Sequence, residues 1–367
     1  MANLRLLVLS VGTRVGQNVL TTLADRREGL ELIATSSVSN EPALFDVDVV
    51  YRVPPTAADP DAFERALLDI MDRERVDLVI PCRDDDVTFL ASLRDRRPDL
   101  AGRLLCGSEA PARLIGDKWL SAEFSARHGL PFAGSIIQCP DGERAAFVAT
   151  HGFPLVAKPR RGYASLDVFV LWNEAQLERA LGQEGCIVQQ FLGDPRTVSD
   201  YLAAIETKGL PLHHTFQGLK HSIQGLIAPD GSIAHVICTR LVSDRRRSKW
   251  VEPDADPMAQ ELGARCARAF AEAGWRGPLN IQCRRAADGG LRIHEFNGRF
   301  TGATAVRWLL GFDEVGAAIE KFTGRRMRSD RADAPAALEA FESIDGRAAD
   351  PKNVESLERD HVWRRVR

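Results

Sequence analysis

Apolar runs of strand length alternate with amphipathic segments along the first part of the chain. The apolar runs stand at 4–11, 30–38 and 76–82. Two segments with helical spacing of their apolar residues lie between them, at 12–26 and 61–75. This alternation is typical of a parallel sheet whose strands are joined by helical crossovers. We therefore predict a Rossmann-like α/β domain over residues 1–110.

An acidic run follows the third apolar segment. Asp84, Asp85 and Asp86 come shortly after the strand-like residues 76–82. Carboxylates are favoured as N-caps and at the positive end of the helix macrodipole. We interpret this run as the start of a helix rather than as a metal site.

Residues 111–192 carry the pattern of a smaller α+β unit. Asp117 and Lys118 begin a helical segment that stops at Gly129. Three strand-like segments follow, at 153–159, 167–172 and 186–192.

Residues 193–325 form a larger unit that is rich in strand signals. Strand-like segments separated by turn signals stand around 201–205, 210–216, 222–228 and 233–242. Pro257 begins a helix, and a β-hairpin pattern follows it over 277–297. Beyond this unit the residues 326–367 contain few large apolar side chains, so we predict a lightly anchored polar tail in which the WRRV segment can add one strand.

The predicted hairpin concentrates side-chain oxygens on one face. Strand residues alternate faces, so Asn280 and Gln282 share one side of the first strand. Glu295 and Asn297 share one side of the second strand for the same reason. If 287–290 form a four-residue loop, the first pair lies directly opposite the second. Two interpretations stay open: a metal–nucleotide site, or an ordinary amphipathic hairpin with its polar face in water.

The chemistry of these side chains suits a divalent metal that is bound together with a nucleotide. Hard cations such as Mg²⁺ are held by few carboxylates together with neutral oxygens and substrate phosphates. One glutamate flanked by glutamine and asparagine meets that requirement. After the second strand, Arg299 stands between Gly298 and Gly302, so the backbone can approach a ligand while a cation faces phosphoryl charge.

The segments G-P-x-N-x-Q at 277–282 and E-x-N-x-R at 295–299 resemble the ATP-grasp superfamily, in the branch that contains the large subunit of carbamoyl phosphate synthetase. The resemblance extends over residues 1–325. It implies an N-terminal Rossmann-like parallel sheet, called the pre-ATP-grasp domain, followed by a two-part ATP-grasp fold of α/β and α+β class. It also implies ATP and Mg²⁺ as cofactors, with two ions bound and Mn²⁺ as an alternative.

Carried over position by position, the resemblance assigns roles to the residues of a nucleotide site. Gln282, Glu295 and Asn297 would be the magnesium ligands. Arg299 and Lys158 would be the catalytic cations at the reacting phosphoryl group. Lys158 would also bind the nucleotide, together with a second lysine, two loop arginines and a hinge strand: Lys118, Arg160, Arg161, Gln189, Gln190, Phe191 and Leu192.

Two segments depart from the family pattern. The loop at 160–167 keeps one glycine, and Leu166 and Asp167 stand where a second glycine is usual. The ribose-side motif E-x-[ST]-[IV]-D is placed at 220–224, where both acids are missing, with 197–200 as the alternative placement. The ribose contacts are therefore the least defined part of the site.

Histidines and cysteines do not form a recognisable nucleophile–base set. His294 alternates with Glu295, so we predict a packed histidine on the opposite face of the hairpin. His213, His214 and His221 stand where they can face the cleft. The seven cysteines are scattered and never in CxxC spacing, which is typical of buried reduced thiols.

Composition excludes several classes of protein. The 367 residues are 44% apolar and 27% charged, as expected for a globular protein of two or three modules. The net charge of −3 and the short basic run at 245–249 argue against nucleic-acid partners. No apolar run approaches the ~20 residues that cross a bilayer, and the first residues lead into a strand instead of a signal peptide. We expect a cytoplasmic protein without a membrane partner.

The resemblance implies that ATP activates a small-molecule carboxylate as an acyl phosphate, which an amine attacks to give an amide or peptide bond with release of ADP and phosphate. Such a reaction requires charge neutralisation and positioning more than a side-chain nucleophile. A homodimer is an open alternative to a monomer. Other functions also stay open: a carbamoyl-phosphate-type synthetase, an ATP-binding sensor or scaffold without turnover, and a dinucleotide oxidoreductase suggested only by the glycine turn at 11–16.

Overall fold

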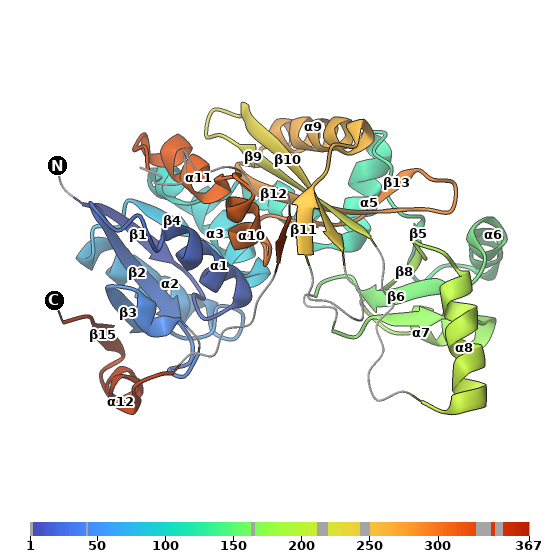
Figure 1. Ribbon diagram of the computed structural model, residues 1–367, viewed down its shortest axis with the longest axis horizontal. Helices are drawn as coiled ribbons and strands as arrows, with labels where there is room; N and C mark the ends of the chain where they lie inside the picture. The colour runs from blue at the N-terminus through green and yellow to red at the C-terminus, as the bar shows by residue number, and fades with distance from the viewer. Residues whose placement is uncertain are drawn as a thin grey trace.

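Three sheets organise the chain (Figure 1). The computed structural model describes residues 3–41, 43–162, 166–210, 219–242, 250–327, 339–341 and 348–366. A five-stranded N-terminal sheet lies at one end, a four-stranded small sheet at the other, and a six-stranded large sheet between them. The predicted α/β and α+β class is confirmed. Within the described ranges, no helix is long and apolar enough to cross a membrane.

The N-terminal sheet is built from apolar strands covered by helices. Its order is β15-β3-β2-β1-β4, and β1 to β4 run parallel. The elements up to the end of this unit are β1 (Leu4–Val8), α1 (Arg14–Leu23), β2 (Leu30–Ser36), β3 (Val49–Arg52), α2 (Pro60–Arg73), β4 (Leu78–Ile80) and α3 (Asp84–Arg96), with 3₁₀ turns at Leu44–Asp46 and Pro98–Arg103. Leu6, Leu7 and Val8 are fully buried, which explains the continuous apolar run of β1.

The C-terminal segment completes this sheet. β15 (Val362–Arg364) pairs antiparallel with β3, and α12 (Pro351–Asp360) packs beside β15. Arg364 donates a 2.9 Å hydrogen bond to the Tyr51 hydroxyl and forms an ion pair with Glu74. The strand expected near the end of the chain is confirmed. The sequence pattern does not predict β3 or α12, because β3 has only four residues and α12 has only two large apolar side chains, Val354 and Leu357.

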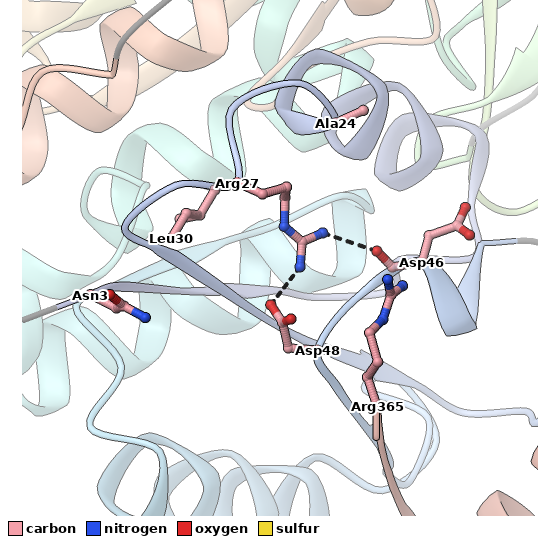
Figure 2. A pocket seen from close by; sticks show the side chains of 7 residues that line it. All are labelled: Asn3, Ala24, Arg27, Leu30, Asp46, Asp48 and Arg365. Atoms are coloured by element: carbon pink, nitrogen blue, oxygen red, sulfur yellow. Dashed lines mark hydrogen bonds and ion pairs between the residues drawn. The ribbon is translucent and has the colours of Figure 1, made fainter. Parts of the chain in front are cut away.

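A cavity of about 520 Å³ lies beside this C-terminal segment, at the amino ends of β1 and β2 (Figure 2). Arg27 donates to the Asp48 carboxylate at 2.5 Å and to the Asp46 carbonyl at 3.1 Å. Arg365 donates to the carbonyl of Val47 at 3.2 Å. Arg365 thus helps to hold the C-terminal segment onto the sheet, and Arg27 and Asp48 pair with each other. Ligands of parallel sheets bind at the carboxyl ends of the strands, which lie at the other edge.

The small sheet packs as a unit of its own. Two helices lead into it, and its order is β5-β8-β6-β7. Its elements are α4 (Glu109–Gly116), α5 (Lys118–Arg127), β5 (Ser135–Ile136), α6 (Asp141–His151), β6 (Leu155–Pro159), β7 (Phe169–Leu171), α7 (Glu174–Leu181) and β8 (Cys186–Gln190). Leu155, Leu177 and Val188 are fully buried in a separate core cluster. The domain boundaries at 110, 192 and 325 stay predictions.

The segment after β8 is a helix, α8 (Arg196–Lys208), where the sequence pattern predicts a strand around 201–205. That prediction is wrong. Val198 and Leu202 lie one helical turn apart, and this spacing outweighs the local strand propensity. Gly209, with φ 84°, ends the helix in a conformation that glycine adopts readily.

The large sheet carries the predicted hairpin at one edge. Its order is β13-β12-β9-β10-β11-β14. Its elements are β9 (Lys220–Ile227), β10 (Ile233–Val242), β11 (Trp250–Pro253), α9 (Pro257–Glu272), β12 (Gly277–Arg285), β13 (Leu291–Asn297), α10 (Thr304–Leu309), α11 (Glu314–Thr323) and β14 (Ala340–Phe341). The strands predicted at 222–228 and 233–242 are confirmed, whereas most of the segment 210–216 lies outside the described residues.

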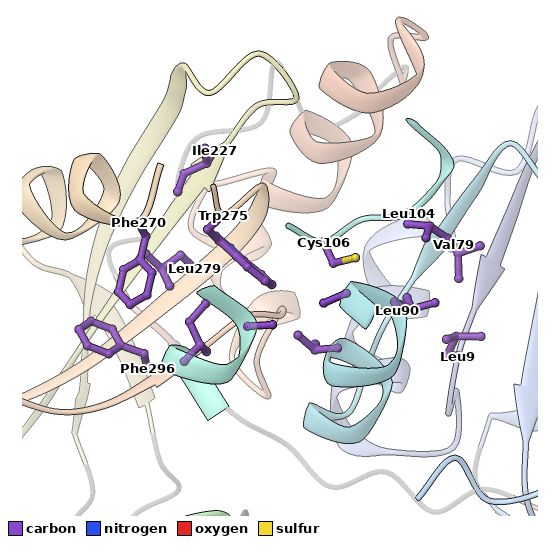
Figure 3. Close-up of a cluster of buried hydrophobic side chains, with 14 of the residues drawn as sticks. Leu9, Val79, Leu90, Leu104, Cys106, Ile227, Phe270, Trp275, Leu279 and Phe296 are labelled. Atoms are coloured by element: carbon purple, nitrogen blue, oxygen red, sulfur yellow. The ribbon is translucent and has the colours of Figure 1, made fainter. Parts of the chain in front are cut away.

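One hydrophobic core joins the N-terminal sheet to the large sheet (Figure 3). It extends from Val79 on β4 and Leu9 just after β1 to Phe296 on β13 and Phe270 on α9. Trp275 is fully buried between them, and its indole N–H donates to the Pro278 carbonyl at 2.9 Å. The N-terminal sheet and the hairpin are therefore packed as one body, which sets the relative position of the side chains at their junction.

Candidate active site

The hairpin of β12 and β13 keeps the predicted register at its polar end. Gln282 pairs with Glu295, and Asn280 pairs with Asn297. The predicted four-residue loop is wrong, because residues 286–290 make the turn. A β-bulge in β13 compensates for the longer turn and restores the expected pairs.

The bulge also changes the environment of His294. Cys283 pairs with Ile293 and Gln282 pairs with Glu295, so His294 is the unpaired residue of the bulge. The bulge interrupts the alternation of faces from which His294 is predicted on the opposite face of the hairpin. The His294 carbonyl accepts a 3.1 Å hydrogen bond from the Lys158 ammonium. Burial lowers the pKa of the imidazole well below its ordinary value, and the charges of Lys158 and other nearby cations lower it further. His294 is therefore a neutral neighbour of the site lysines.

The polar face of the hairpin continues onto β9. The register forms two rows across three strands: Ser222, Gln282 and Glu295 in one, and Gln224, Asn280 and Asn297 in the other. Asn280 is fully buried and Asn297 is 5% exposed. The polar face is therefore not solvated at these two positions, whereas Gln282 and Glu295 are partly exposed.

Several polar atoms of this face have no hydrogen-bond partner in the part of the chain that the structure describes. They are both amide atoms of Gln224, Asn280 Oδ1, Asn297 Nδ2 and Arg299 Nε. A buried polar atom without a partner costs roughly 1–3 kcal/mol. A cluster of such atoms indicates a place that a polar ligand or solvent completes.

Two buried lysines meet Glu295 at the edge of this face. Lys118 begins α5, and its Nζ lies 3.5 Å from Glu295 Oε1 and 3.3 Å from the Gly162 carbonyl. Lys158 lies on β6 and, like Lys118, is 8% exposed. The pKa of Lys158 is lowered to about 8, mainly by burial. The negative charge of Glu295 opposes this shift, and the positive charge of Lys118 adds to it. Three distant segments thus bring two cations and one carboxylate together.

Arg299 connects the hairpin to the N-terminal sheet. Its guanidinium donates to the Asp84 carboxylate at 2.8 Å, to Asn297 Oδ1 at 3.2 Å and to the Phe300 carbonyl at 3.2 Å. Asp84 is the first residue of α3, so the predicted helix start is confirmed. The contact with Arg299 is not foreseen from the sequence, although a helix start after a parallel strand marks the end of the sheet where ligands bind.

Asp86, also in the first turn of α3, is a buried carboxylate at the same end of the sheet. Its oxygens accept hydrogen bonds from the Ser10 hydroxyl at 3.2 Å, the Thr56 hydroxyl at 3.1 Å and the Arg83 backbone N–H at 3.1 Å. Burial raises the pKa of Asp86 to about 6, although these hydrogen bonds oppose the rise.

The variant Asp86→Asn is expected to alter the pH dependence of stability. The pKa of Asp86 in the folded protein is about 6, above the ordinary 3.8. Asp86 therefore contributes fully to the free energy of unfolding below about pH 4, and this contribution is lost as the pH rises through 6. The lost contribution corresponds to about 3 kcal/mol. Asparagine has no ionisable group, so it lacks this loss, and its NH₂ group can donate to the Ser10 and Thr56 hydroxyls in place of the carboxylate oxygen. Urea unfolding at pH 4 and pH 7 compares the two proteins, and an identical pH dependence would contradict the assignment.

The two arginines of the loop after β6 face Asp117. Arg160 makes two hydrogen bonds to this carboxylate, at 2.9 and 3.1 Å. Arg161 approaches the same carboxylate at 3.5 Å, and its side chain is 72% exposed. Asp117 is also the N-cap of α5, so the arginines support the helix turn that carries Lys118. Phosphate binding by either arginine stays a prediction.

The end of that loop keeps a glycine-like backbone. Asp167 has φ 55°, in the left-handed region, at a position where the family pattern has a glycine. Aspartate visits this region more readily than most residues. The change of residue therefore need not change the course of the backbone here. Residues 163–165 lie outside the described residues.

Residues 189–192 connect the small sheet to the hairpin. Gln189 is buried and donates to the Ser135 hydroxyl at 3.0 Å. Leu192 packs with Ala286 at the turn between β12 and β13. The segment therefore lies where two units meet, as a nucleotide hinge requires, and its role stays a prediction.

The proposed ribose segment divides its side chains between the two faces of β9. Gln224 belongs to the polar face. His221 lies on the other face, opposite Cys283, with its Nδ1 2.6 Å from Asp254 Oδ2. His221 therefore does not face the candidate site. The other candidates of this region lie outside the described residues: His213, His214 and the basic run at 245–249.

Comparisons with known proteins bear on the fold. The family model described as the PylC-like N-terminal domain matches residues 6–101. A comparison with curated protein sequences finds no match. The biotin carboxylase–β,γ-ATP complex from Campylobacter jejuni is similar over 89% of this chain and 72% of that chain, with 15% identity and a TM-score of 0.62. The chain has the ATP-grasp fold.

Two further ATP-grasp structures support this assignment. N5-carboxyaminoimidazole synthetase from Staphylococcus aureus is similar over 98% of this chain and 86% of that chain, with 11% identity and a TM-score of 0.64. The biotin carboxylase domain dimer of 2-oxoglutarate carboxylase from Hydrogenobacter thermophilus, in complex with MgADP, is similar over 93% of this chain and 73% of that chain, with 17% identity and a TM-score of 0.61. The resemblance inferred from the hairpin motifs is thus confirmed for the fold.

Proposed function

We propose that this chain is an ATP-dependent carbon–nitrogen ligase, which activates a small carboxylate as an acyl phosphate and couples it to an amine. The observation that carries the proposal is the meeting of Lys118, Lys158 and Glu295 beside a polar face on which several buried atoms lack hydrogen-bond partners among the described residues. Two cations and a carboxylate at one point are the groups that a metal–nucleotide complex requires. The similar structures with β,γ-ATP and MgADP support ATP as the nucleotide.

The side chains of the hairpin fit a magnesium site. Gln282, Glu295 and Asn297 offer one carboxylate and two amide oxygens, which are hard donors. The Glu295 carboxylate lies 3.5 Å from the Lys118 ammonium, so this contact is loose and can yield to a metal. We propose that these three residues hold Mg²⁺, as two ions when ATP is present, and that Mn²⁺ can replace it. The bound metal supplies charge neutralisation for the phosphates.

The cations are assigned by position. Lys118 and Lys158 bind the phosphates, and Arg299 faces the γ-phosphate from the end of β13. Arg160 and Arg161 stand close enough to add phosphate contacts if they leave Asp117. Residues 189–192 read the adenine edge through their backbone.

The reaction consists of two displacements in which the chain acts by position and charge. A carboxylate oxygen attacks the γ-phosphorus of ATP, and the bond to the β,γ-bridging oxygen breaks to release ADP. The amine nitrogen then attacks the acyl carbon, loses a proton, and releases phosphate. Arg299 and Lys158 stabilise the negative charge that develops on the transferred group.

One observation favours a second candidate, an ATP-binding protein of the same fold without turnover. Lys220 and Gln224 occupy the two positions of β9 where the family motif carries acids. A carbamoyl-phosphate-type synthetase would activate bicarbonate in the same site, and it would then phosphorylate the resulting carbamate with a second ATP.

The experiment that tests the proposal measures ADP release with Mg²⁺ against a panel of amino acids and small carboxylates, each with and without an amine. ADP release that requires both a carboxylate and an amine supports the ligase. Stabilisation by Mg-ATP in a thermal shift assay without ADP release on any combination supports the second candidate. ADP and phosphate release with bicarbonate alone would favour the carbamoyl-phosphate type.

Assembly and location follow as lesser proposals. The similar biotin carboxylase domain is described as a dimer, and we propose a homodimer for this chain. We also propose that it works in the cytoplasm. Light scattering after size exclusion tests the first, and a monomer at micromolar concentration would contradict it.

A further inference from the structure

We propose that Asp84 is a positioning residue for Arg299, which it holds from the N-terminal sheet at the γ-phosphate end of the site. The inference deepens the proposed function and rests on it, because Arg299 has a γ-phosphate to recognise only if the chain binds ATP. Asp84 and Arg299 are 215 residues apart in sequence; Asp84 begins α3 beside the N-terminal sheet, and Arg299 follows β13 of the large sheet.

The contact holds part of the guanidinium and leaves part available. Arg299 Nη2 lies 2.8 Å from Asp84 Oδ2, and the Nη1 group donates to the Phe300 carbonyl at 3.2 Å. Among the described residues, the buried Nε atom has no partner. The two side chains are 14% and 32% exposed, so the pair is screened less than a surface ion pair. Nη2 also donates to Asn297 Oδ1 at 3.2 Å. The protein therefore holds both Nη groups in place, and the Nε–H remains to donate to an anion.

Helix capping does not account for Asp84. The N-cap of α3 is Arg83, and its backbone N–H donates to Asp86 at 3.1 Å. Asp85 pairs with the Arg83 side chain at 3.1 Å. The other two acids of the run thus serve the helix start, and the carboxylate of Asp84 is directed at Arg299.

The backbone beside Arg299 is shaped for this approach. A Cβ atom at Gly298 would lie 2.7 Å from the Trp275 ring and 3.2 Å from a methyl group of Val87 on α3. Only glycine allows the chain after β13 to lie so close to both. Trp275 is fully buried in the core that joins the two sheets. The distance between Asp84 and Arg299 is therefore set by rigid packing on both sides.

The test measures how strongly the full-length protein prefers ATP to ADP. Calorimetric titration with Mg²⁺ and either ADP or a non-hydrolysable ATP analogue gives the ratio of the two affinities. We expect Asp84→Ala to lower this ratio about tenfold, the size of a misplaced charge-assisted contact. Asp84→Asn, which keeps the shape, is expected to fall between wild type and Asp84→Ala. The matched control is Asp85→Ala, which removes an acid from the same helix turn and is expected to leave the ratio unchanged.

A double-mutant cycle separates positioning from other roles. In an Arg299→Ala background, where the ratio is already low, adding Asp84→Ala is expected to change it less than about twofold. A higher ratio in Asp84→Ala would show that the acid only reduces the positive potential, and an unchanged ratio with a lower Tm would show a structural role. Either result overturns the proposal while leaving the ligase intact. Failure of the wild type to bind either nucleotide would overturn the proposed function and this inference together.

Discussion

The variant Glu295→Gln is expected to reduce Mg²⁺-dependent ADP release by at least ~10³-fold. Glu295 is the carboxylate of the proposed metal set, and its oxygen is also the one that lies 3.5 Å from the Lys118 ammonium. Replacement by glutamine keeps the shape and the strand pairing with Gln282 but removes the negative charge. Two neighbouring cations then lose the group that balances them. The measurement is the rate of ADP release at saturating Mg²⁺ and ATP.

A control and a second readout make this result specific. Glu272→Gln makes the same chemical change at the exposed end of α9, and we expect it to keep wild-type turnover. Titration with Mn²⁺, followed by electron paramagnetic resonance in the presence of ATP, is expected to show weaker binding in Glu295→Gln alone. Wild-type turnover in Glu295→Gln would remove the metal assignment.

The second large effect is expected at Lys158. We expect Lys158→Met to weaken Mg-ATP binding by about 10²-fold, because a buried ammonium that contacts phosphate contributes about 1.5–3 kcal/mol. The wild type should also respond to pH. The pKa of Lys158 in the free protein is about 8, so the lysine is charged below pH 8 and loses its proton as the pH rises past that value. Because phosphate binding needs the charged form, the affinity should fall about tenfold between pH 7 and pH 9.

Arginine at this position provides the matched control. Lys158→Arg keeps a positive charge throughout this range, since the guanidinium stays protonated even when buried. We expect its affinity for Mg-ATP to be lower than that of the wild type at pH 7 and constant up to pH 9. Parallel pH profiles of the wild type and Lys158→Arg would show that another group titrates, and would contradict the role of Lys158.

The parts of the site that lie within one strand or one hairpin could be predicted from the sequence. The alternation of faces put Asn280 with Gln282 on one side of the first strand and Glu295 with Asn297 on one side of the second, and both pairs belong to the observed polar face. Local patterns also predicted that Lys118 begins a helix and that Lys158 stands near the end of a strand. Such features depend on periodicities of two and 3.6 residues, which are written directly into the sequence.

The features that depend on packing between distant elements could not be predicted. The bulge at His294 has no sequence signature, because it depends on both the length of the turn at 286–290 and the pairing register of the two strands. The pairing of Asp84 with Arg299 requires the relative position of two sheets, which their shared core determines. The pairing of Arg160 with Asp117 equally depends on where the loop returns to α5. In each case the sequence offers the residue type but not its partner.

The most direct test of the central claim follows an oxygen atom. With a carboxylate substrate labelled in both oxygens with ¹⁸O, activation as an acyl phosphate transfers one labelled oxygen to phosphate when the amine displaces it. The released phosphate is measured by mass spectrometry, with turnover supported by Mg²⁺, ATP and the amine. We predict one ¹⁸O atom in each phosphate released. Phosphate that contains no label, with ADP formed at the same rate, would mean that water attacks ATP directly and would contradict carboxylate activation.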